Sequence, residues 1–409
     1  MKRRFPRVSE LRPLLKFELP SLDRRAARLA HAADVWDLRT TARRRTPTPA
    51  FDYVDGAAQR ELTARRTREA FDAVELLPRI LHGTEKVDLS TSIAGGISSL
   101  PFGIAPTGFT RFMHAEGEDA GASAAAAAGI PFSLSTMGTR SIEQVAATAP
   151  EGRRWFQLYL WKDRQKSLDL LRRAEASGFD TLLVTVDTPV AGQRLRDARN
   201  GMVIPPRLTI KTVLDASYRP EWWFNFLTTD PLTFASLSGT SQDLPTLINS
   251  MFDPSLSMAD LEWIRSMWAG KLLVKGVLTA EDTRRALDAG ADGLIVSNHG
   301  GRQLDRAPVS LRALPEVRAE AGDGVEIILD SGIMSGADIV AALCAGADFT
   351  LIGRAYLYGL MAGGREGVDR VIELLAKEIE VTMQLVGAAT IEDLGPHLLR
   401  TWPEPERID

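Results

Sequence analysis

The chain has 409 residues, of which 44% are hydrophobic and 25% are charged, a composition typical of a globular protein with a substantial core. The single cysteine, Cys344, excludes structural disulfides and multi-cysteine zinc or iron–sulfur sites. The net charge of -4 argues against general nucleic-acid binding. The five histidines stand at positions 31, 82, 114, 299 and 397, which is not the spacing of a metal site.

Charge is unevenly distributed along the chain. Residues 1–46 contain thirteen Lys or Arg and five Asp or Glu, about +8, so the other residues carry about -12 by subtraction from -4. The basic start MKRRFPRV is followed by charged residues and not by an apolar segment. No secretory signal is therefore expected, and a cytoplasmic location is predicted.

Eight short apolar runs recur from residue 101 onward, and amphipathic helical stretches flank them. Continuous apolar runs are typical of parallel strands that are covered on both faces. Eight strand–helix units predict an α/β fold, a (β/α)8 TIM barrel, and a doubly wound parallel sheet is the competing architecture. The runs are residues 101–106, 131–136, 154–160, 181–186, 271–276, 293–298, 326–331 and 349–354.

The rest of the chain divides around these runs. We expect a helical N-terminal extension at residues 1–95 that packs on the barrel, the barrel itself at 96–390, and a C-terminal tail at 391–409. A long insertion, residues 190–265, separates the fourth and fifth strands and contains the aromatic segment PEWWFNFLTTDPLTF at 220–234. This segment is either a helical subdomain on the barrel rim or a patch that binds a membrane surface.

The chemistry of such a barrel is expected at the carboxyl ends of its strands. The polar residues and glycines at these ends form a dense ring of donors, acceptors and opposite charges, which a purely structural barrel would not need. They are Thr107, Gly108, Ser135, Gln157, Tyr159, Thr185, Asp187, Lys275, Ser297, His299, Asp330, Gly353 and Arg354.

The segment SNHGGRQLD, residues 297–305, is the most informative motif. A base, His299, and a bidentate anion clamp, Arg302, stand three residues apart across a double glycine and could face one small substrate. Asp187 ends the neighbouring fourth strand and could orient the imidazole. The other four histidines are interpreted as ordinary packed or surface residues.

Two loops after the last strands are candidates for phosphate binding. DSGIMSG at 330–336 and IGR at 352–354 carry glycines that let backbone N–H groups approach an oxyanion, and Arg354 adds charge. Lys275 is either a rim lysine or a fixed charge beside a redox cofactor. Tyr53 and Tyr159 could donate phenolic hydrogen bonds, although packing accounts for most tyrosines.

Seven motifs in this order resemble the FMN-dependent α-hydroxy-acid dehydrogenase and oxidase family, and most of all its quinone-linked L-lactate dehydrogenases. They are FDYVDGAA, IAPTG, FQLY, TVDTP, LLVKG, SNHGGRQLD and IGR, and the resemblance runs from about residue 30 to about residue 390. The segments RNGMVIPPRLT, at 199–209, and WWF add to it. The resemblance implies FMN across the barrel mouth and a homo-oligomer, a tetramer.

The resemblance also implies roles for particular residues. The flavin and its phosphate would contact Thr107, Gly108, Ser135, Gln157, Thr185, Lys275, Ser297, Asp330, Gly332, Gly353 and Arg354. Arg302 and Arg194, with Tyr53, would bind the substrate carboxylate, and Tyr159 would bind its hydroxyl group. His299, supported by Asp187, would be the base. Met334 departs from the pattern, because many relatives carry an arginine there.

The reaction implied is oxidation of an L-2-hydroxy acid, most of all L-lactate to pyruvate, with electrons passing through FMN to a quinone or another acceptor. The basic N-terminus and the aromatic insertion suit a peripheral place on the inner face of the cell membrane. The alternatives are an oxidase that yields hydrogen peroxide from glycolate or longer hydroxy acids, and a mandelate-type dehydrogenase. Gly108 resembles the dehydrogenase-like members. A non-catalytic FMN-binding interaction protein is disfavoured, because His299, Asp187, Arg302 and Lys275 are all present.

Overall fold

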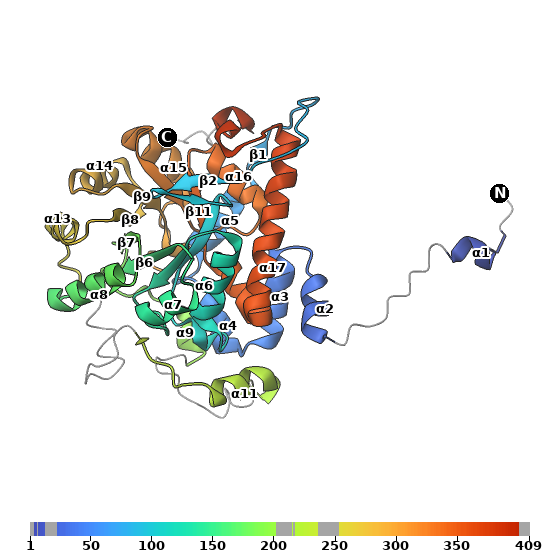
Figure 1. Ribbon diagram of the computed structural model, residues 1–409, viewed down its shortest axis with the longest axis horizontal. Helices are drawn as coiled ribbons and strands as arrows, with labels where there is room; N and C mark the ends of the chain where they lie inside the picture. Colours follow the sequence, from blue (N-terminus) through green and yellow to red (C-terminus); the bar gives the residue numbers. More distant parts are fainter. Residues whose placement is uncertain are drawn as a thin grey trace.

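A closed barrel of eight parallel strands forms the centre of the computed structural model (Figure 1). The structure describes residues 4, 5, 7–12, 23–201, 215, 217–235 and 253–400. Around the barrel the strand order is β10-β11-β4-β5-β6-β7-β8-β9, so chain neighbours are also spatial neighbours. The strands are β4 (Phe102–Thr107), β5 (Phe132–Ser135), β6 (Arg154–Leu158), β7 (Thr181–Thr185), β8 (Lys271–Val277), β9 (Gly293–Val296), β10 (Glu326–Leu329) and β11 (Phe349–Ile352).

Each predicted apolar run therefore contains one barrel strand. The (β/α)8 barrel is confirmed, and the closure of β4 against β11 excludes the doubly wound sheet, which has open edges. Most strand residues are fully buried because the barrel interior covers one face and the helices cover the other. The flanking helices are α6 (Gly117–Ala128), α7 (Ile142–Thr148), α8 (Arg164–Ala176), α13 (Met258–Met267), α14 (Ala280–Asp288), α15 (Ser310–Ala321), α16 (Gly336–Cys344) and α17 (Arg354–Val386).

Local capping explains where several of these helices begin and end. Reciprocal capping boxes start α7 at Ser141 with Gln144 and α16 at Ser335 with Asp338. Gly129 ends α6 with a φ of 66°, a left-handed conformation that lets the chain turn into β5. The two capping boxes follow the carboxyl ends of β5 and β10, on the side of the site, whereas Gly129 turns the chain at the opposite end of the barrel.

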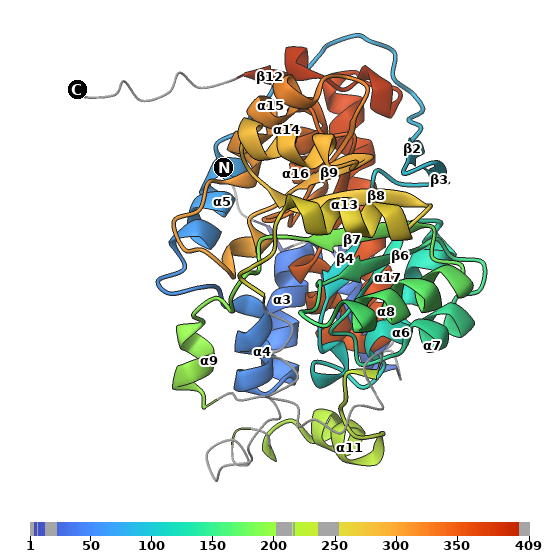
Figure 2. The ribbon, with the colours of Figure 1, turned by 90° about the vertical axis from the view of Figure 1, so that its left-hand side faces the viewer.

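A hairpin closes one end of the barrel. Its strands, β2 (Thr91–Ile93) and β3 (Gly96–Ser98), contribute Ile93 and Ala94 to a cluster of buried interior residues. Arg153 donates hydrogen bonds to the carbonyls of Ile93, at 2.9 Å, and Gly96, at 3.0 Å. In both views the hairpin lies at the opposite end from α4, α9 and α11 (Figures 1 and 2). The carboxyl ends of the strands are thereby left for the site.

The N-terminal segment adds helices to the barrel. They are α1 (Val8–Leu11), α2 (Arg24–Ala30), α3 (Val35–Arg45), α4 (Thr48–Asp55) and α5 (Leu62–Asp72). The apolar face of α3 is buried at Val35, Leu38 and Ala42, and α3 packs along α17. Strand β1 (Glu75–Leu76) pairs antiparallel with β12 (Leu399–Arg400). Short 3-10 turns are η1 (Thr110–Phe112), η3 (His299–Gly301), η4 (Ile391–Asp393) and η5 (Pro396–Leu398).

Only part of the predicted insertion is described. Residues 202–214, 216 and 236–252 lie outside the described residues, and with them most of the segment 199–209; so do 1–3, 6, 13–22 and the tail from 401. The described part contains α9 (Leu195–Arg199) and α11 (Pro220–Thr228). The domain boundaries proposed from the sequence stay predictions.

Helix α11 carries the aromatic segment and has two different faces. Trp222 donates its indole N–H to the carbonyl of Phe112 at 3.1 Å, and its ring stacks on Phe226 with centroids 4.8 Å apart. Phe224 and Leu227 are each 69% exposed. Within the described ranges, no helix is long and apolar enough to cross a membrane.

Candidate active site

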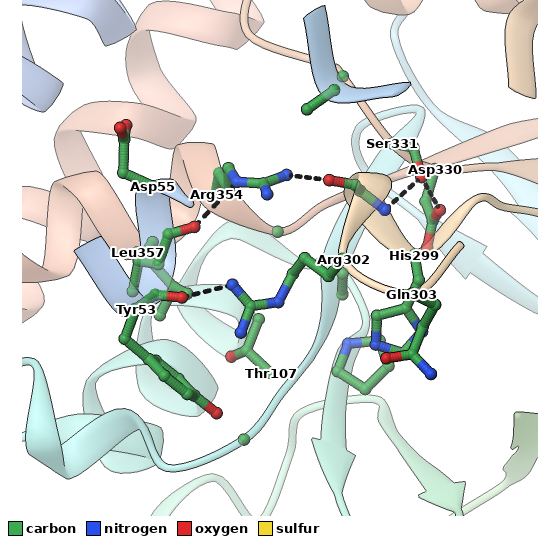
Figure 3. A pocket seen from close by; sticks show the side chains of 18 of the residues that line it. Tyr53, Asp55, Thr107, His299, Arg302, Gln303, Asp330, Ser331, Arg354 and Leu357 are labelled. Atoms are coloured by element: carbon green, nitrogen blue, oxygen red, sulfur yellow. Dashed lines mark hydrogen bonds between the residues drawn. The ribbon is translucent and has the colours of Figure 1, made fainter. Parts of the chain in front are cut away.

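A cavity of about 510 Å³ opens at the carboxyl ends of the barrel strands (Figure 3). Most of the residues predicted from the sequence line it, together with residues of α3, α4, α5 and α17. The predicted residues that line it are Tyr53, Thr107, Gly108, Ser135, Tyr159, Arg194, Lys275, His299, Arg302, Asp330, Gly332, Gly353 and Arg354. The other four, Gln157, Thr185, Asp187 and Ser297, lie behind this wall and support it through hydrogen bonds.

The side chains of His299 and Asp187 form a hydrogen-bonded pair in the site. Nδ1 of His299 lies 2.9 Å from Oδ1 of Asp187. Burial favours the protonated acid, but the charge and hydrogen bond of the imidazole outweigh it and hold the pKa of Asp187 below its usual value. An ionised Asp187 accepts the hydrogen bond, so Nδ1 carries the proton and Nε2 remains as the basic nitrogen. His299 has a φ of 55°, and the N-cap Asn298 accepts a hydrogen bond from Gly301 at 3.1 Å within the same turn.

Two guanidinium groups stand beside Tyr53. The central carbon of Arg302 lies 4.9 Å from the centre of the Tyr53 ring, and that of Arg194 lies 5.4 Å from it. Arg302 donates hydrogen bonds to the backbone carbonyl of Tyr53 (Figure 3) and to that of Gly56. Burial, and then repulsion from Arg194, lower the pKa of Arg302 to about 9, so it remains charged at neutral pH.

The positive charges of Arg302 and Arg194 are not fully balanced by nearby carboxylates. Among the described residues, no carboxylate lies within 4.0 Å of Arg302, and the nearest to Arg194 is Asp197 at 3.8 Å. A desolvated cation of this kind is costly unless an anion joins it. The cavity is therefore built to receive an anionic group beside Tyr53.

Lys275 lies in the floor of the cavity with defined partners. Its Nζ is 2.7 Å from Oδ2 of Asp330 and donates a hydrogen bond to Oγ of Ser297, also at 2.7 Å. Ser331 donates to Oδ1 of Asp330 at 2.8 Å and accepts the N–H of Gly300 at 2.9 Å. This chain of contacts joins the floor of the cavity to the loop that carries His299 and Arg302.

A row of neutral polar groups continues along the wall. Ser135 donates to the side-chain carbonyl of Gln157 at 2.9 Å, and the amide of Gln157 donates to Thr185 at 3.0 Å. All three residues are buried. Tyr159 stands above this row, and burial, with the charge of Asp187, raises the pKa of its phenol far above its usual value. Within the described stretches, no group of three or more His, Cys, Asp or Glu side chains could hold a metal ion.

The loops 330–336 and 352–354, predicted to bind a phosphate, border the cavity. The guanidinium of Arg354, however, is bonded to backbone carbonyls and is not free to bind an anion with all its N–H groups. Its guanidinium donates to the carbonyls of Val54 at 2.9 Å, Gly300 at 2.9 Å and Gly56 at 2.8 Å. It therefore joins α4 to the loop after β9. Its role toward a phosphate stays a prediction, resting on the proximity of its charge.

A second arginine from α5 organises the neighbouring loop. Arg68 donates to the carbonyl of Gly332 at 2.8 Å and pairs with Asp338 at 2.7 Å, while Met334 lines the cavity.

An added Cβ at Gly353 would meet only Ala105, at 3.8 Å, so this glycine leaves open space in the cavity.

Sequence reasoning missed three residues of this region. Ser331 has a φ of 80° and accepts hydrogen bonds from the loop after β9, and Gln303 lines the cavity and bonds the loop after β7. Asp55 also lines the cavity, as the centre of an ionic cluster on α4. All three residues lie inside motifs that were singled out, Asp55 in FDYVDGAA, but only the tertiary structure reveals the ionic cluster at Asp55.

Comparisons with known proteins identify the family. The sequence profile described as FMN-dependent dehydrogenase matches residues 42–401. A protein of Mycobacterium tuberculosis, named provisionally as an L-lactate dehydrogenase, is 57% identical over 396 residues, 97% of this chain and 96% of that protein. The L-lactate dehydrogenase of Ectopseudomonas mendocina is 43% identical over 89% of this chain and 97% of its own. The crystal structure of the monotopic membrane protein (S)-mandelate dehydrogenase matches with a TM-score of 0.88 and 37% identity, over 91% of this chain and 100% of that one.

A closed barrel with this site and these relatives defines a flavin enzyme of the hydroxy-acid class. The chain belongs to the FMN-dependent dehydrogenase family, and its cofactor is FMN. The resemblance seen in its motifs is thereby confirmed. The residues present fit that cofactor, because a buried row of neutral donors and acceptors adjoins Lys275 and the open space at Gly353 adjoins the glycine loop.

The Asp55 cluster predicts a pH-dependent stability. Although burial opposes it, hydrogen bonds from Arg39 at 2.6 Å, Tyr358 at 2.8 Å and Arg196 at 2.8 Å lower the pKa of Asp55 to about 2. A depressed pKa stabilises the fold above the unfolded value of 3.8, and this contribution is lost as pH falls through about 2. Asp55→Asn should cost about 2 kcal/mol at pH 7, measured by urea unfolding, and the difference from the unsubstituted protein should shrink between pH 4 and pH 2.

The control for that measurement is Asp72→Asn. The side chain of Asp72 is 64% exposed in its pair with Arg68, so this substitution should cost less than about 1 kcal/mol. Equal effects of the two substitutions at pH 7 would contradict the assignment of the ionic cluster to Asp55.

Proposed function

We propose that the protein oxidises an L-2-hydroxy acid, L-lactate in preference, to the 2-oxo acid, and that a quinone is the final electron acceptor. The observation that carries the proposal is the pairing of a base with an anion site. His299, oriented by Asp187 at 2.9 Å, and the incompletely balanced cation Arg302 line one cavity. A small molecule with a carboxylate beside a carbinol carbon satisfies both groups.

The carboxylate would bind between the two arginines. Arg302 and Arg194 flank the ring of Tyr53, and the charge of a substrate carboxylate would offset the desolvation of Arg302. Arginine suits this role because its planar fork can hold both oxygens of a carboxylate. Binding there would place the hydroxyl-bearing carbon toward His299 and Tyr159, which stays protonated at neutral pH and can donate a hydrogen bond.

The base would be Nε2 of His299. Since Nδ1 is bonded to Asp187, Nε2 takes a proton from the reacting centre, and the negative charge of Asp187 stabilises the imidazolium that results. The low-polarity surroundings strengthen this attraction. FMN, when bound, supplies the two-electron acceptor that the oxidation requires.

The residues that would hold FMN lie along the floor and wall of the cavity. Thr107, Gly108, Ser135, Gln157 and Thr185 would contact the ring, and Lys275, supported by Ser297 and Asp330, would place a positive charge beside it. Gly332, Gly353 and Arg354 would hold the phosphate. Gln157 and Thr185 lie behind the residues that line the cavity and would act on the ring through Ser135, which bonds Gln157, whereas Ser297 would act through its hydrogen bond with Lys275.

The preference for L-lactate is supported by the relatives. Both curated relatives described above bear that activity in their names, whereas the solved structure described above is a mandelate dehydrogenase. Met137 lines the cavity beside Gly108, where an added Cβ would lie 2.8 Å from Cβ of Met137. An unbranched thioether leaves room for lactate and for longer chains. A mandelate-type substrate is therefore the second candidate.

The most direct test of the proposed function is anaerobic reduction of the holoenzyme. L-Lactate should bleach the flavin absorbance, and D-lactate should not, because the arginine pair, Tyr159 and His299 would each act at a different substituent of the chiral carbon. (S)-Mandelate and glycolate complete the substrate panel. Failure of every 2-hydroxy acid to bleach the flavin would refute the proposal, and a faster reaction with mandelate would favour the second candidate.

The same assay checks the base and the acceptor. His299→Gln should keep FMN but lower the rate of reduction by about 10² to 10⁴-fold, whereas exposed His397→Gln should not change it. The reduced enzyme should react faster with a quinone analogue than with oxygen. Rapid oxygen consumption with release of hydrogen peroxide would instead identify an oxidase.

We also propose that α11 attaches the protein to a membrane surface, as part of a homo-oligomer of four chains. Phe224 and Leu227 are exposed, while Trp222 ties the helix to the barrel through Phe112. Such a helix can bury its apolar face at the headgroup boundary. The similarity to a monotopic membrane enzyme supports this placement.

Substitutions on the exposed face of α11 test the attachment. The double variant Phe224→Ser with Leu227→Ser should bind vesicles of mixed neutral and anionic lipid at least about tenfold more weakly. The reason is that it lacks two apolar side chains that would be buried in the lipid. Reduction by L-lactate should be retained. The control is Leu385→Ser, an exposed leucine on α17. Unchanged vesicle binding by the α11 variant would exclude this helix as the anchor.

A further inference from the structure

Two loops at the barrel mouth carry the residues of the proposed base and of the proposed carboxylate site. The loop after β7 carries Asp187 and Arg194, and the loop after β9 carries His299 and Arg302. The imidazole–carboxylate pair and the arginine pair each include one residue from each loop. The relative position of the two loops therefore decides whether both pairs form.

Gln303 links these loops through both ends of its carboxamide. Its Nε2 donates to the carbonyl of Val190 at 2.9 Å and to that of Asp187 at 3.3 Å, while its Oε1 accepts the N–H of Gly192 at 3.2 Å. The donors and acceptors match only in this orientation of the amide. Figure 3 shows Gln303 beside His299 in the cavity.

The backbones of the two loops also approach closely beside Gln303. An added Cβ at Gly192 would clash with the carbonyl oxygen of Arg302 and lie 2.8 Å from Cα of Gln303. A third segment continues the junction, since the N–H of Ala58 donates to the carbonyl of Gly301 at 2.8 Å and that of Gln59 donates to the carbonyl of Gln193 at 2.7 Å. The amide of Gln303 is the side-chain link in this junction.

The side chain of Asp187 makes the backbone contact important. Its Oδ1 bonds His299, but its Oδ2 is buried without a hydrogen-bond partner among the described residues. The carboxylate is therefore held on one side by the imidazole that it must orient. Its position depends on its backbone, whose carbonyl Gln303 binds.

We infer that Gln303 is a positioning residue for the proposed oxidation, one that acts by holding the Asp187 loop in register with His299. The inference rests on the proposed function. Removal of the clamp should misplace the carboxylate by a fraction of an ångström to an ångström, enough to slow a reaction that depends on orientation. Binding of the substrate carboxylate should change less than the rate, because Arg302 keeps its hydrogen bonds to Tyr53 and Gly56 even where Arg194 moves with the loop.

The kinetic test uses Gln303→Ala in the holoenzyme with L-lactate under anaerobic conditions. The limiting rate of flavin reduction should fall about tenfold to a hundredfold, with a change of less than about threefold in the half-saturating concentration. Gln303→Glu keeps the acceptor but lacks the two donors, so it should lose the rate as well. Leu304→Ala, an exposed neighbour on the same loop, is the matched control and should retain the rate.

A double-mutant cycle separates positioning from general stability. In an Asp187→Asn background, Gln303→Ala should lower the remaining rate by less than about threefold, since the group through which it acts is already lost. The same loss of rate in both backgrounds, or no loss in either, would overturn the inference. A uniform loss of thermal stability without this dependence on Asp187 would show a structural role only.

Hydrogen exchange provides a readout that does not depend on turnover. In Gln303→Ala and Gln303→Glu, peptides that cover residues 187–193 should exchange faster than in the unsubstituted holoenzyme, with the barrel strands unchanged. Unaltered exchange in this loop would refute the clamp even if the rates fell. If no 2-hydroxy acid reduces the unsubstituted enzyme, the proposed function fails, and the exchange measurement still decides whether Gln303 holds the loop.

Discussion

The arrangement on which the site depends is a half-buried positive charge, that of Arg302, with no full partner among the described residues. Arg302 is desolvated, lies near a second guanidinium, and bonds only neutral carbonyls in the described structure. Such a charge is tolerated when a ligand completes it. In the proposed reaction, His299 in the same cavity, paired with Asp187, acts on the anion once it is bound.

The fold produces this arrangement by bringing distant segments to one end of the barrel. The parallel strands and the loops that follow them bring the side chains of the proposed reaction together, and α4 with its C-cap adds Tyr53 and the carbonyls that hold Arg302 and Arg354. Two residues in left-handed conformations, His299 and Ser331, lie in adjacent loops and are linked through Gly300. Conformations of this kind cost about 1–3 kcal/mol each, and they persist because the surrounding hydrogen bonds over-determine them.

The sequence allowed the barrel and most of the cavity wall to be predicted, for a physical reason. Buried parallel strands are continuous apolar runs, and the residues that end them must converge at one face, so Lys275 and His299 could be placed without coordinates. Contacts between loops carry no such pattern. Nothing in its position along the chain indicates that Gln303 binds the loop after β7, or that the fork of Arg354 is directed at three backbone carbonyls.

The proposed recognition of the substrate carboxylate by Arg302 can be tested without turnover, by a binding measurement. Oxalate, an unreactive dianion, is titrated into the holoenzyme and into Arg302→Met while the flavin absorbance is followed, with L-lactamide as the uncharged comparison. If Arg302 binds the carboxylate, the dissociation constant of oxalate should rise at least about 100-fold in the variant, because a desolvated charge pair is lost. The dissociation constant of L-lactamide should change little. Equal affinity of the two proteins for oxalate would contradict this role of Arg302.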